Sequence, residues 1–182
     1  MKNVFVFLAT GFEEIEALTP VDILRRAGID VKLVSITGDE IVTGARGINV
    51  KADLLFENID SDLADILVLP GGMPGTTNLM KYEPLMELIE KYNNNGKNIA
   101  AICAAPTIFG KLGLLEGKKA TCYPGMEDDL IGAQVCYDSV VTDGNITTSR
   151  GMGTALDFSL ELLNIFKGEE EAKSMAEKVV KM

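Results

Sequence analysis

The feature that most constrains the fold of this chain is an alternation of short apolar runs with amphipathic stretches. The clearest apolar runs lie at 4–9, 66–69 and 98–102, and a further strand-like run lies at 30–36. Short apolar runs that stop at glycine, proline or a charged residue are typical of strands buried on both faces, as in a parallel sheet. The sequence therefore predicts several buried parallel strands.

Helical patterns separate these runs. The stretch 13–27 is amphipathic and stops before Gly28, a residue that favours the left-handed conformation found after helices. Further helical patterns lie at 83–92, 104–112, 155–166 and 169–181, and strands at 140–142 and 146–148 flank a short turn, as in a hairpin. Strand, helix and strand with short joins imply parallel crossovers. We predict an α/β three-layer sandwich of the flavodoxin-like kind with a mostly parallel sheet.

Composition narrows the possible functions. At 182 residues the chain fits one domain, 1–182, and no part of it has the composition of a linker. Its 27 acidic and 17 basic residues give a net charge of −10, which disfavours binding to a nucleic-acid backbone. No apolar run reaches the ~18 residues that a membrane span needs, and the short apolar start is unlike a signal peptide. We expect a cytoplasmic protein with no membrane partner.

The absence of histidine excludes more chemistry than any motif does. Ser-His-Asp and Cys-His catalysis, histidine-ligated zinc and a histidine pH switch all need an imidazole, and the chain has none. Cys103, Cys122 and Cys136 are an odd number without a C-x-x-C pair, which disfavours a disulfide framework and a four-cysteine zinc site. Dinucleotide and Walker motifs are also missing. We expect neither a metal nor an organic cofactor.

Three unusual segments each follow a predicted strand: 11–16, 71–76 and Cys103. Ligands of open parallel sheets bind outside the carboxyl ends of the strands. We therefore expect these three segments to meet at one edge of the sheet.

Cys103 is the strongest candidate in these segments. It stands where the strand 98–102 meets a helix, among small residues that suit the sharp turn of a nucleophile elbow. We expect the helix amino terminus to stabilise a thiolate there. The alternative is that Cys103 is a small buried apolar side chain, as most cysteines are and as we expect Cys122 and Cys136 to be.

Glu16 lies on the same face of the predicted helix as Pro20, Ile23 and Ala27, and these three residues are apolar or small. A carboxyl group beside an apolar face loses solvation, so we expect Glu16 to resist ionisation. A protonated Glu16 could donate a hydrogen bond to a thiolate, and an ionised one could take up a proton. The alternative is a glutamate that only interacts with the helix dipole.

Gly71 and Gly72 follow the strand 66–69. Two glycines in succession allow backbone N–H groups to approach a ligand oxygen, as in an oxyanion hole. Most glycine pairs are plain turns, so this signal is weak by itself.

Four longer segments match a known family. They are GFEEIEALTPVDILRRAG at 11–28, LPGGMPG at 69–75, AICAAP at 101–106 and TSRGMGTALDF at 148–158. In these segments, which are spread over nearly the whole length, the chain resembles the ThiJ/PfpI superfamily, in particular the subgroup of the parkinsonism-associated protein deglycase.

The resemblance implies a homodimer and a set of pocket residues. These are Cys103 as a nucleophilic or oxidation-sensitive cysteine, Glu16 as a protonated glutamate, Gly72 and Ala104 as backbone donors, and Gly71, Arg46 and Arg26 around the pocket. In relatives, this pocket is associated with glutathione-independent conversion of methylglyoxal to lactate, with reversal of early glycation on proteins, and with peroxide sensing through cysteine sulfinate. Other branches are described as proteases or chaperones.

The chain departs from the family at one position. Relatives usually carry a His-Pro pair near the cysteine, and the matching pair here is Tyr123-Pro124. A phenol with an ordinary pKa near ~10 cannot act as a neutral base at pH 7, although it can donate a hydrogen bond. Cys-His protease chemistry, and the amidotransferase chemistry found on the same class I glutamine amidotransferase-like fold, therefore lose their base.

Three functions stay open on the sequence. In a glyoxalase-type or deglycase-type enzyme, Cys103 attacks a small aldehyde or an early glycation adduct on a protein, and Glu16 moves a proton without a cofactor. In a non-catalytic redox sensor, or a stress-response or chaperone-like protein, Cys103 is instead oxidised reversibly or to sulfinate. A small-ligand binding module with an inert thiol would show neither behaviour.

Overall fold

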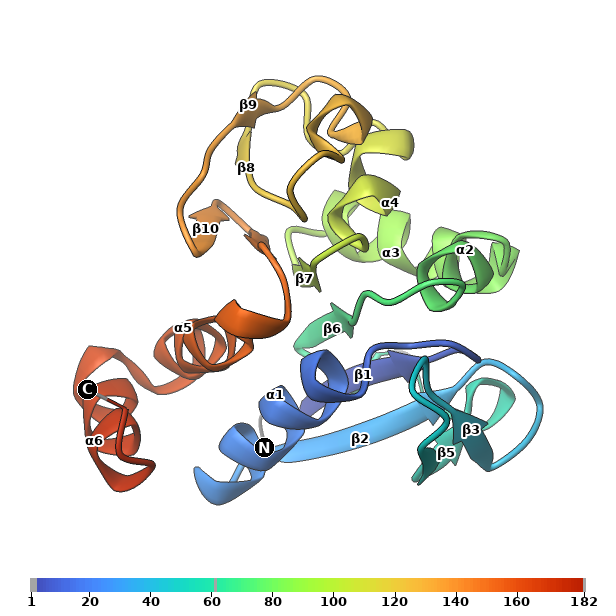
Figure 1. Ribbon diagram of the computed structural model, residues 1–182, viewed down its shortest axis with the longest axis horizontal. Coiled ribbons are helices and arrows are strands. Elements are labelled where there is room, and N and C mark those ends of the chain that lie inside the picture. The colour runs from blue at the N-terminus through green and yellow to red at the C-terminus, as the bar shows by residue number, and fades with distance from the viewer. Residues whose placement is uncertain (1–2, 61, 182) are drawn as a thin grey trace.

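A seven-stranded sheet forms the centre of the computed structural model, which describes residues 3–60 and 62–181. The strand order is β10-β11-β7-β6-β1-β2-β5, and each neighbouring pair is parallel except β10 with β11 (Figure 1). The strands are β1 (Asn3–Leu8), β2 (Asp30–Ser35), β5 (Leu54–Leu55), β6 (Ile66–Leu69), β7 (Asn98–Ile102), β10 (Val140–Asp143) and β11 (Ile146–Ser149).

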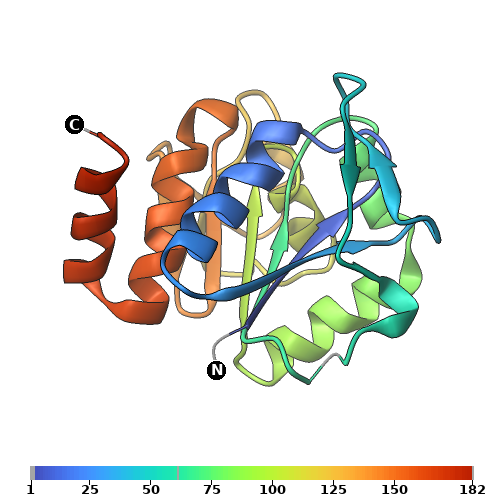
Figure 2. The same cartoon turned by 90° about the horizontal axis from the view of Figure 1, so that it is seen from below.

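Helices cover both faces of the sheet. One face packs against α1 (Glu14–Arg26) and α5 (Ala155–Lys167), with α6 (Glu169–Lys178) against α5, and the other packs against α2 (Gly75–Met80), α3 (Glu83–Asn94) and α4 (Pro106–Lys111). In Figure 2 the blue α1 and the orange-red α5 lie side by side, with the red α6 beyond α5. The predicted flavodoxin-like α/β sandwich is confirmed.

β1 shows why this chain forms a three-layer structure. Val4, Val6 and Leu8 belong to the apolar core under α1 and α5, whereas Phe5 and Phe7 belong to the core under α3 and α4. Successive side chains of a strand point to opposite faces, so an uninterrupted apolar run fills both cores at once. This strand therefore has to lie at the middle of the sandwich.

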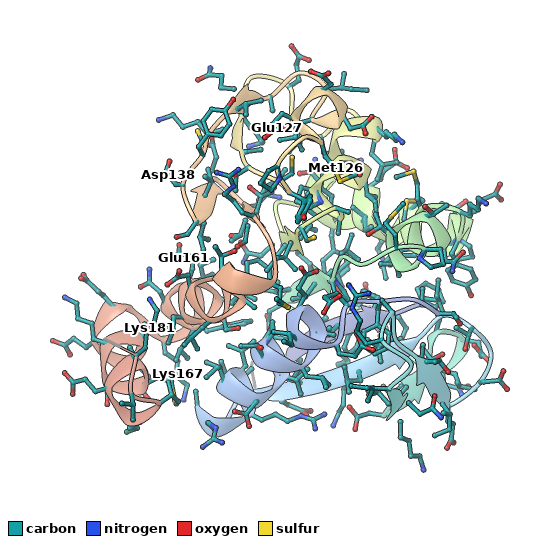
Figure 3. The ribbon with its side chains drawn as sticks, viewed as in Figure 1. Met126, Glu127, Asp138, Glu161, Lys167 and Lys181 are labelled. Carbon is teal, nitrogen blue, oxygen red and sulfur yellow. The ribbon has the colours of Figure 1, made fainter. Side chains whose placement is uncertain are left out.

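Hydrogen bonds and ion pairs connect the helices of the first face. Lys167, which is labelled in Figure 3, lies at the end of α5. It donates a hydrogen bond of 2.5 Å to the carbonyl oxygen of Ala27, just after α1. Lys181 pairs with Asp157 of α5. Within α5 itself only Lys167 is exposed, as its apolar composition predicts. The carboxyl-terminal segment is thus attached to the same core as α1.

The structure also holds elements that the sequence analysis did not predict. These are α2, the short β5, the hairpin of β3 (Ile41–Thr43) and β4 (Asn49–Lys51), the pair β8 (Lys119–Ala120) and β9 (Gln134–Val135), and 3-10 helices at Phe56–Asn58, Glu127–Asp129 and Met152–Thr154. The helix predicted at 104–112 is wrong at its start, because α4 begins at Pro106. None of the helices in the described part of the chain is long and apolar enough to cross a membrane. The cytoplasmic location and the absence of nucleic-acid binding stay predictions.

The order in which successive strands are added to the sheet reverses at β1. The chain runs from β1 outward to β2 and β5, and then returns to place β6 on the other side of β1. Ligands of open parallel sheets bind at such a reversal, outside the carboxyl ends of the strands. The segments after β1, β6 and β7 all lead to this edge.

Candidate active site

Cys103 occupies the turn between β7 and α4 in an unusual backbone conformation. Its φ is +66°, in the left-handed region that residues with a side chain rarely adopt. Two hydrogen bonds hold this turn: the Cys103 N–H donates to the Ser149 carbonyl at 2.9 Å, and the Tyr123 N–H donates to the Cys103 carbonyl at 2.8 Å. Strained residues held in this way cluster at functional sites. The sharp turn predicted for Cys103 is present.

Glu16 lies in the first turn of α1, and only 1% of it is exposed. Its Oε2 accepts a hydrogen bond of 3.0 Å from the Gly71 N–H, and its carboxyl group also hydrogen-bonds to Cys103 and to the Met152 N–H. Burial raises the pKa of Glu16 to about 7, more than these hydrogen bonds lower it. Glu16 therefore resists ionisation, as its apolar helix row predicts.

The pKa of Cys103 differs from the sequence expectation. We expected a helix amino terminus to stabilise a thiolate, but α4 is only six residues long and starts three residues after Cys103. Burial, followed by the nearby charge of Glu16, raises the pKa of Cys103 to about 12. Backbone hydrogen bonds from Ala104 and Gly72 act in the opposite direction and are outweighed. The thiol is thus not ionised independently of its neighbour.

Cys103 and Glu16 therefore titrate as a unit. Strongly interacting groups lose their protons in steps that belong to the pair and to neither residue alone. Because the pKa of Glu16 is raised and that of Cys103 is raised further, we expect the pair to hold one proton and one negative charge over the pH range between the two ionisations. When the proton is on Glu16, the charge is on sulfur and faces the N–H groups of Gly72 and Ala104. A reactive thiolate is reached by moving one proton within the pair.

Gly71 and Gly72 let the backbone pass close to this pair. A Cβ on Gly71 would lie 2.7 Å from both Cys103 Cβ and Glu16 Oε2, a distance that real atoms do not tolerate. Gly72 has a φ of +89°, and a Cβ there would lie 2.4 Å from the Glu13 backbone nitrogen. We expected the Gly72 and Ala104 N–H groups to face a substrate oxygen, and here they point at the Cys103 sulfur.

A cleft of about 500 Å³ opens above Cys103 and Glu16. Besides these two it is lined by Glu13, Ala45, Arg46, Gly72, Met73, Ala104, Tyr123, Met126 and Met152. Arg46 lies at the mouth, with its guanidinium 3.9 Å from the Glu13 carboxylate and its side chain 75% exposed. Tyr123 also lines the cleft and is half exposed.

Arg26 lies away from the cleft, so its expected place at the pocket mouth is wrong for the single chain. It is the last residue of α1, and the helical rise separates it from Glu16 by about 15 Å along the axis. Its Nε donates to Asp22 at 2.7 Å on the exposed side of the helix. Residues 16 and 26 therefore belong to opposite ends of one helix.

Sequence reasoning missed the contribution of the segment after β11. Met152 donates its N–H to Glu16, and Gly151 faces both reacting side chains. The sequence predicts residues 146–148 only as one half of a hairpin. β11 also pairs in parallel with β7, so its carboxyl end meets the same edge as that of β7. The motif at 148–158 was the available signal.

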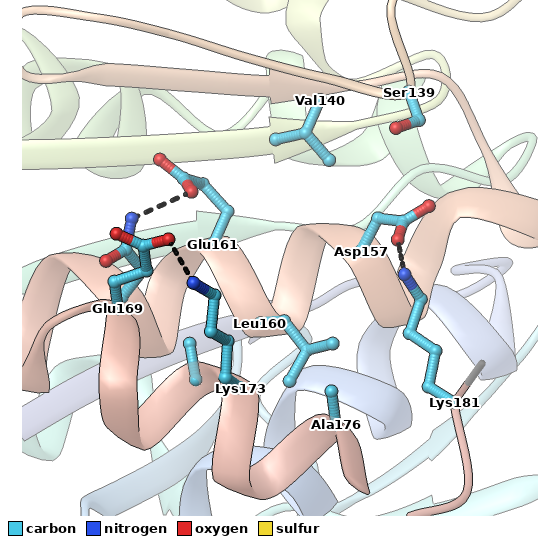
Figure 4. Close-up of a pocket in the computed structure, with 11 residues that line it drawn as sticks. Ser139, Val140, Asp157, Leu160, Glu161, Glu169, Lys173, Ala176 and Lys181 are labelled. Atoms are coloured by element: carbon cyan, nitrogen blue, oxygen red, sulfur yellow. Dashed lines mark hydrogen bonds and ion pairs between the residues drawn. The ribbon is translucent and has the colours of Figure 1, made fainter.

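A second cavity of about 420 Å³ lies between α5, α6 and the start of β10 (Figure 4). Two ion pairs line it: Glu169 pairs with Lys173 within α6, and Asp157 of α5 pairs with Lys181. No cysteine lines this cavity. Among residues 3–60 and 62–181, no three Cys, Asp or Glu side chains gather closely enough to hold a metal ion.

Comparison with known proteins agrees with this geometry. Residues 2–165 match the model of the DJ-1/PfpI family. The chain belongs to the DJ-1/PfpI family. It is 38% identical to the protein dj-1beta of Drosophila melanogaster, over 96% of this chain and 95% of that protein. It is 35% identical to a deglycase of Pyrococcus abyssi, over 91% of this chain and 99% of that protein.

Other relatives of this DJ-1/PfpI chain extend the comparison. The DJ-1 homolog B of Arabidopsis thaliana is 42% identical over 94% of this chain, which spans only 40% of that protein. A solved structure of oxidised DJ-1 from Toxoplasma gondii superimposes with a TM-score of 0.95 at 36% identity, covering 99% of this chain and 98% of that one. The Toxoplasma gondii structure thus shares the fold over nearly the whole chain.

Proposed function

We propose that this protein is a cofactor-independent enzyme of the glyoxalase or deglycase type, acting through Cys103 on small 2-oxoaldehydes or early glycation adducts. The observation that carries the proposal is the hydrogen-bonded pair of Glu16 and Cys103 beside an open cleft. The pair combines a nucleophile with an acid whose pKa of about 7 suits proton transfer near neutral pH. The deglycase name of the Pyrococcus abyssi relative supports the same chemistry.

The first step joins the sulfur to the substrate. As Glu16 takes the thiol proton, Cys103 Sγ attacks the aldehyde carbon and forms a hemithioacetal. The oxygen bonded to the attacked carbon gains negative charge. We expect the Gly72 and Ala104 N–H groups, which donate to the sulfur in the free protein, to donate to that oxygen in the adduct.

The second step moves a proton within the adduct. Glu16 first gives the thiol proton to the alkoxide oxygen of the adduct and becomes a carboxylate again. It then removes the proton from C1 and returns it to C2, while the proton of the C1 hydroxyl group passes to the C2 oxygen, which converts the hemithioacetal to a thioester of a 2-hydroxy acid. Water then hydrolyses the thioester, releasing the hydroxy acid and regenerating the thiol. The net change is the addition of one water molecule to the 2-oxoaldehyde, so no external oxidant or reductant is needed.

Lactate formation from methylglyoxal by the pure protein tests this proposal. We expect the wild type to release lactate, and Cys103→Ser and Glu16→Gln each to lose at least ~10²-fold in kcat/KM, because each removes a positioned group. Cys136→Ser is the control, since Cys136 lies outside the cleft. The proposal is abandoned if no lactate forms, or if both site variants match the wild type.

One observation favours a second candidate function, a cysteine redox sensor. The Toxoplasma gondii relative is described as oxidised in its solved structure, and Cys103 is accessible from the cleft here. Peroxide treatment followed by mass spectrometry distinguishes the cysteines. A sensor role predicts that Cys103 forms sulfenate or sulfinate before Cys122 or Cys136 does. Earlier oxidation of either other cysteine would rule the sensor out.

A further inference from the structure

Gly151 leaves room for about one methyl group beside the reacting atoms. A Cβ built on this glycine would lie 3.9 Å from Cys103 Sγ, 3.9 Å from Glu16 Oε1 and 3.4 Å from Tyr123 Cδ2. These are ordinary van der Waals distances, so the position could hold a methyl group without a clash. The backbone there is extended, with φ 162°, a conformation that any residue adopts. Glycine is therefore not required for the fold, and its missing side chain leaves room for substrate atoms.

The cleft is larger than the smallest 2-oxoaldehydes need. Methylglyoxal has five non-hydrogen atoms and fills roughly 150 Å³ if each takes the volume of one water molecule. The cleft holds about 500 Å³. If the aldehyde carbon is bonded to Cys103, most of the cleft remains for the substituent on the neighbouring carbonyl.

The side chains around this remaining space are mostly apolar. Tyr123, Met73 and Met152 line the cleft and are 51%, 59% and 53% exposed, and Met126 lines it while packing against the core. Thioethers adapt to the shape of a ligand and make favourable contacts with aromatic rings. A tyrosine ring adds a rigid flat surface. The charged groups at the mouth, Arg46 and Glu13, already pair with each other.

We propose that Tyr123, Met126 and Met152, together with the methyl-sized space beside Gly151, form an apolar subsite that selects 2-oxoaldehydes with an aromatic or large apolar substituent. This rests on the proposed function for its substrate class, but the subsite itself is a property of the cleft. Tyr123, at the position where relatives carry histidine, then contributes a binding surface and not a base. A 2-oxoaldehyde whose apolar substituent is half enclosed by these side chains should have a kcat/KM about tenfold higher than that of methylglyoxal, whose substituent is a methyl group.

The subsite can be tested without turnover, through alkylation of Cys103. Phenacyl bromide and bromoacetone both form a bond from sulfur to carbon with loss of bromide, and differ in a phenyl or methyl substituent. Each rate at Cys103, followed by mass spectrometry, is divided by the rate with N-acetylcysteine. We expect this normalised preference for phenyl to be about tenfold in the wild type and about threefold or less in Tyr123→Ala.

Two further variants separate the subsite from a general effect on the fold. Gly151→Ala adds a methyl group within the subsite, so it should slow phenacyl bromide more than bromoacetone. Tyr137→Ala removes an exposed tyrosine that contacts Arg150 outside the cleft, and should keep the wild-type preference. An equal normalised rate for both reagents in the wild type, or an unchanged preference in Tyr123→Ala, overturns the subsite.

Turnover of phenylglyoxal and methylglyoxal distinguishes the two proposals. If neither is converted but Cys103 still prefers phenacyl bromide, the proposed function fails and the subsite stands. If both are converted with equal kcat/KM and the alkylation shows no preference, the function stands and the subsite fails.

Discussion

Glu16 makes the folded state less stable above neutral pH. An exposed glutamate, as in the unfolded chain, has a pKa of 4.5, whereas the pair of Glu16 and Cys103 in the folded protein first ionises at a pH of about 7. Below pH 4.5 the carboxyl group is protonated in both states. As the pH rises through 4.5 to about 7, the unfolded chain ionises first, and folding loses about 3 kcal/mol. Glu16 therefore lowers the free energy of unfolding at and above neutral pH. A residue that destabilises the fold in this way is typical of a functional site.

Glu16→Gln should remove that cost. The amide keeps the shape of the carboxyl group and stays neutral, so we expect the variant to be more stable than the wild type by about 2–3 kcal/mol at pH 8, and similar to it at pH 4. Urea unfolding at the two pH values measures the difference. A variant that is less stable than the wild type at pH 8 would show that Glu16 is mainly a structural residue.

At the scale of elements, the site depends on how closely the β6–α2 segment passes the β7–α4 turn. Gly71→Ala would place a methyl group 2.7 Å from Cys103 Cβ and from Glu16 Oε2. We expect it to destabilise the fold by about 1–3 kcal/mol and to abolish the proposed activity, because the pair must separate.

Gly153→Ala is the matched control for Gly71→Ala, since a Cβ on Gly153 would meet nothing within 4 Å. It should leave both thermal unfolding and turnover unchanged. If Gly71→Ala behaves like Gly153→Ala, the close approach of the two segments is not essential.

The elements of the sandwich could largely be predicted from the sequence, whereas the site could be predicted only in part. The apolar run at 4–9 fixes β1 because its two sets of side chains fill two cores. The carboxyl-end rule brought Glu16, Gly71 and Cys103 together correctly. The direction of the Cys103 pKa could not be predicted, because it depends on burial and on the approach of Glu16 from another element.

At the scale of the whole molecule, we propose the homodimer that the family resemblance implies. Ile15 and Ile48, which are 47% and 54% exposed, flank the buried Glu14. Among the described residues, Glu14 Oε2 has no hydrogen-bond partner, although buried polar atoms usually have one. An apolar surface around an unsatisfied carboxylate is consistent with a face that a second copy covers.

Light scattering at micromolar concentration should therefore give twice the chain mass of 19.6 kDa. We expect Ile15→Lys to shift the protein toward the monomer, because it places a charge in the apolar contact. Val180→Lys is the control, since Val180 is 80% exposed at the other end of the chain. A wild-type monomer would refute the dimer.

The pH dependence of Cys103 alkylation by iodoacetamide tests the central claim, that Cys103 and Glu16 share one proton, most directly. The shared proton predicts a wild-type rate that rises through pH of about 7, where the pair acquires its negative charge. In Glu16→Gln this rise should vanish, and reaction should begin only above about pH 9. A single inflection near pH 9 in both proteins would show that the thiol titrates alone, and would contradict the account.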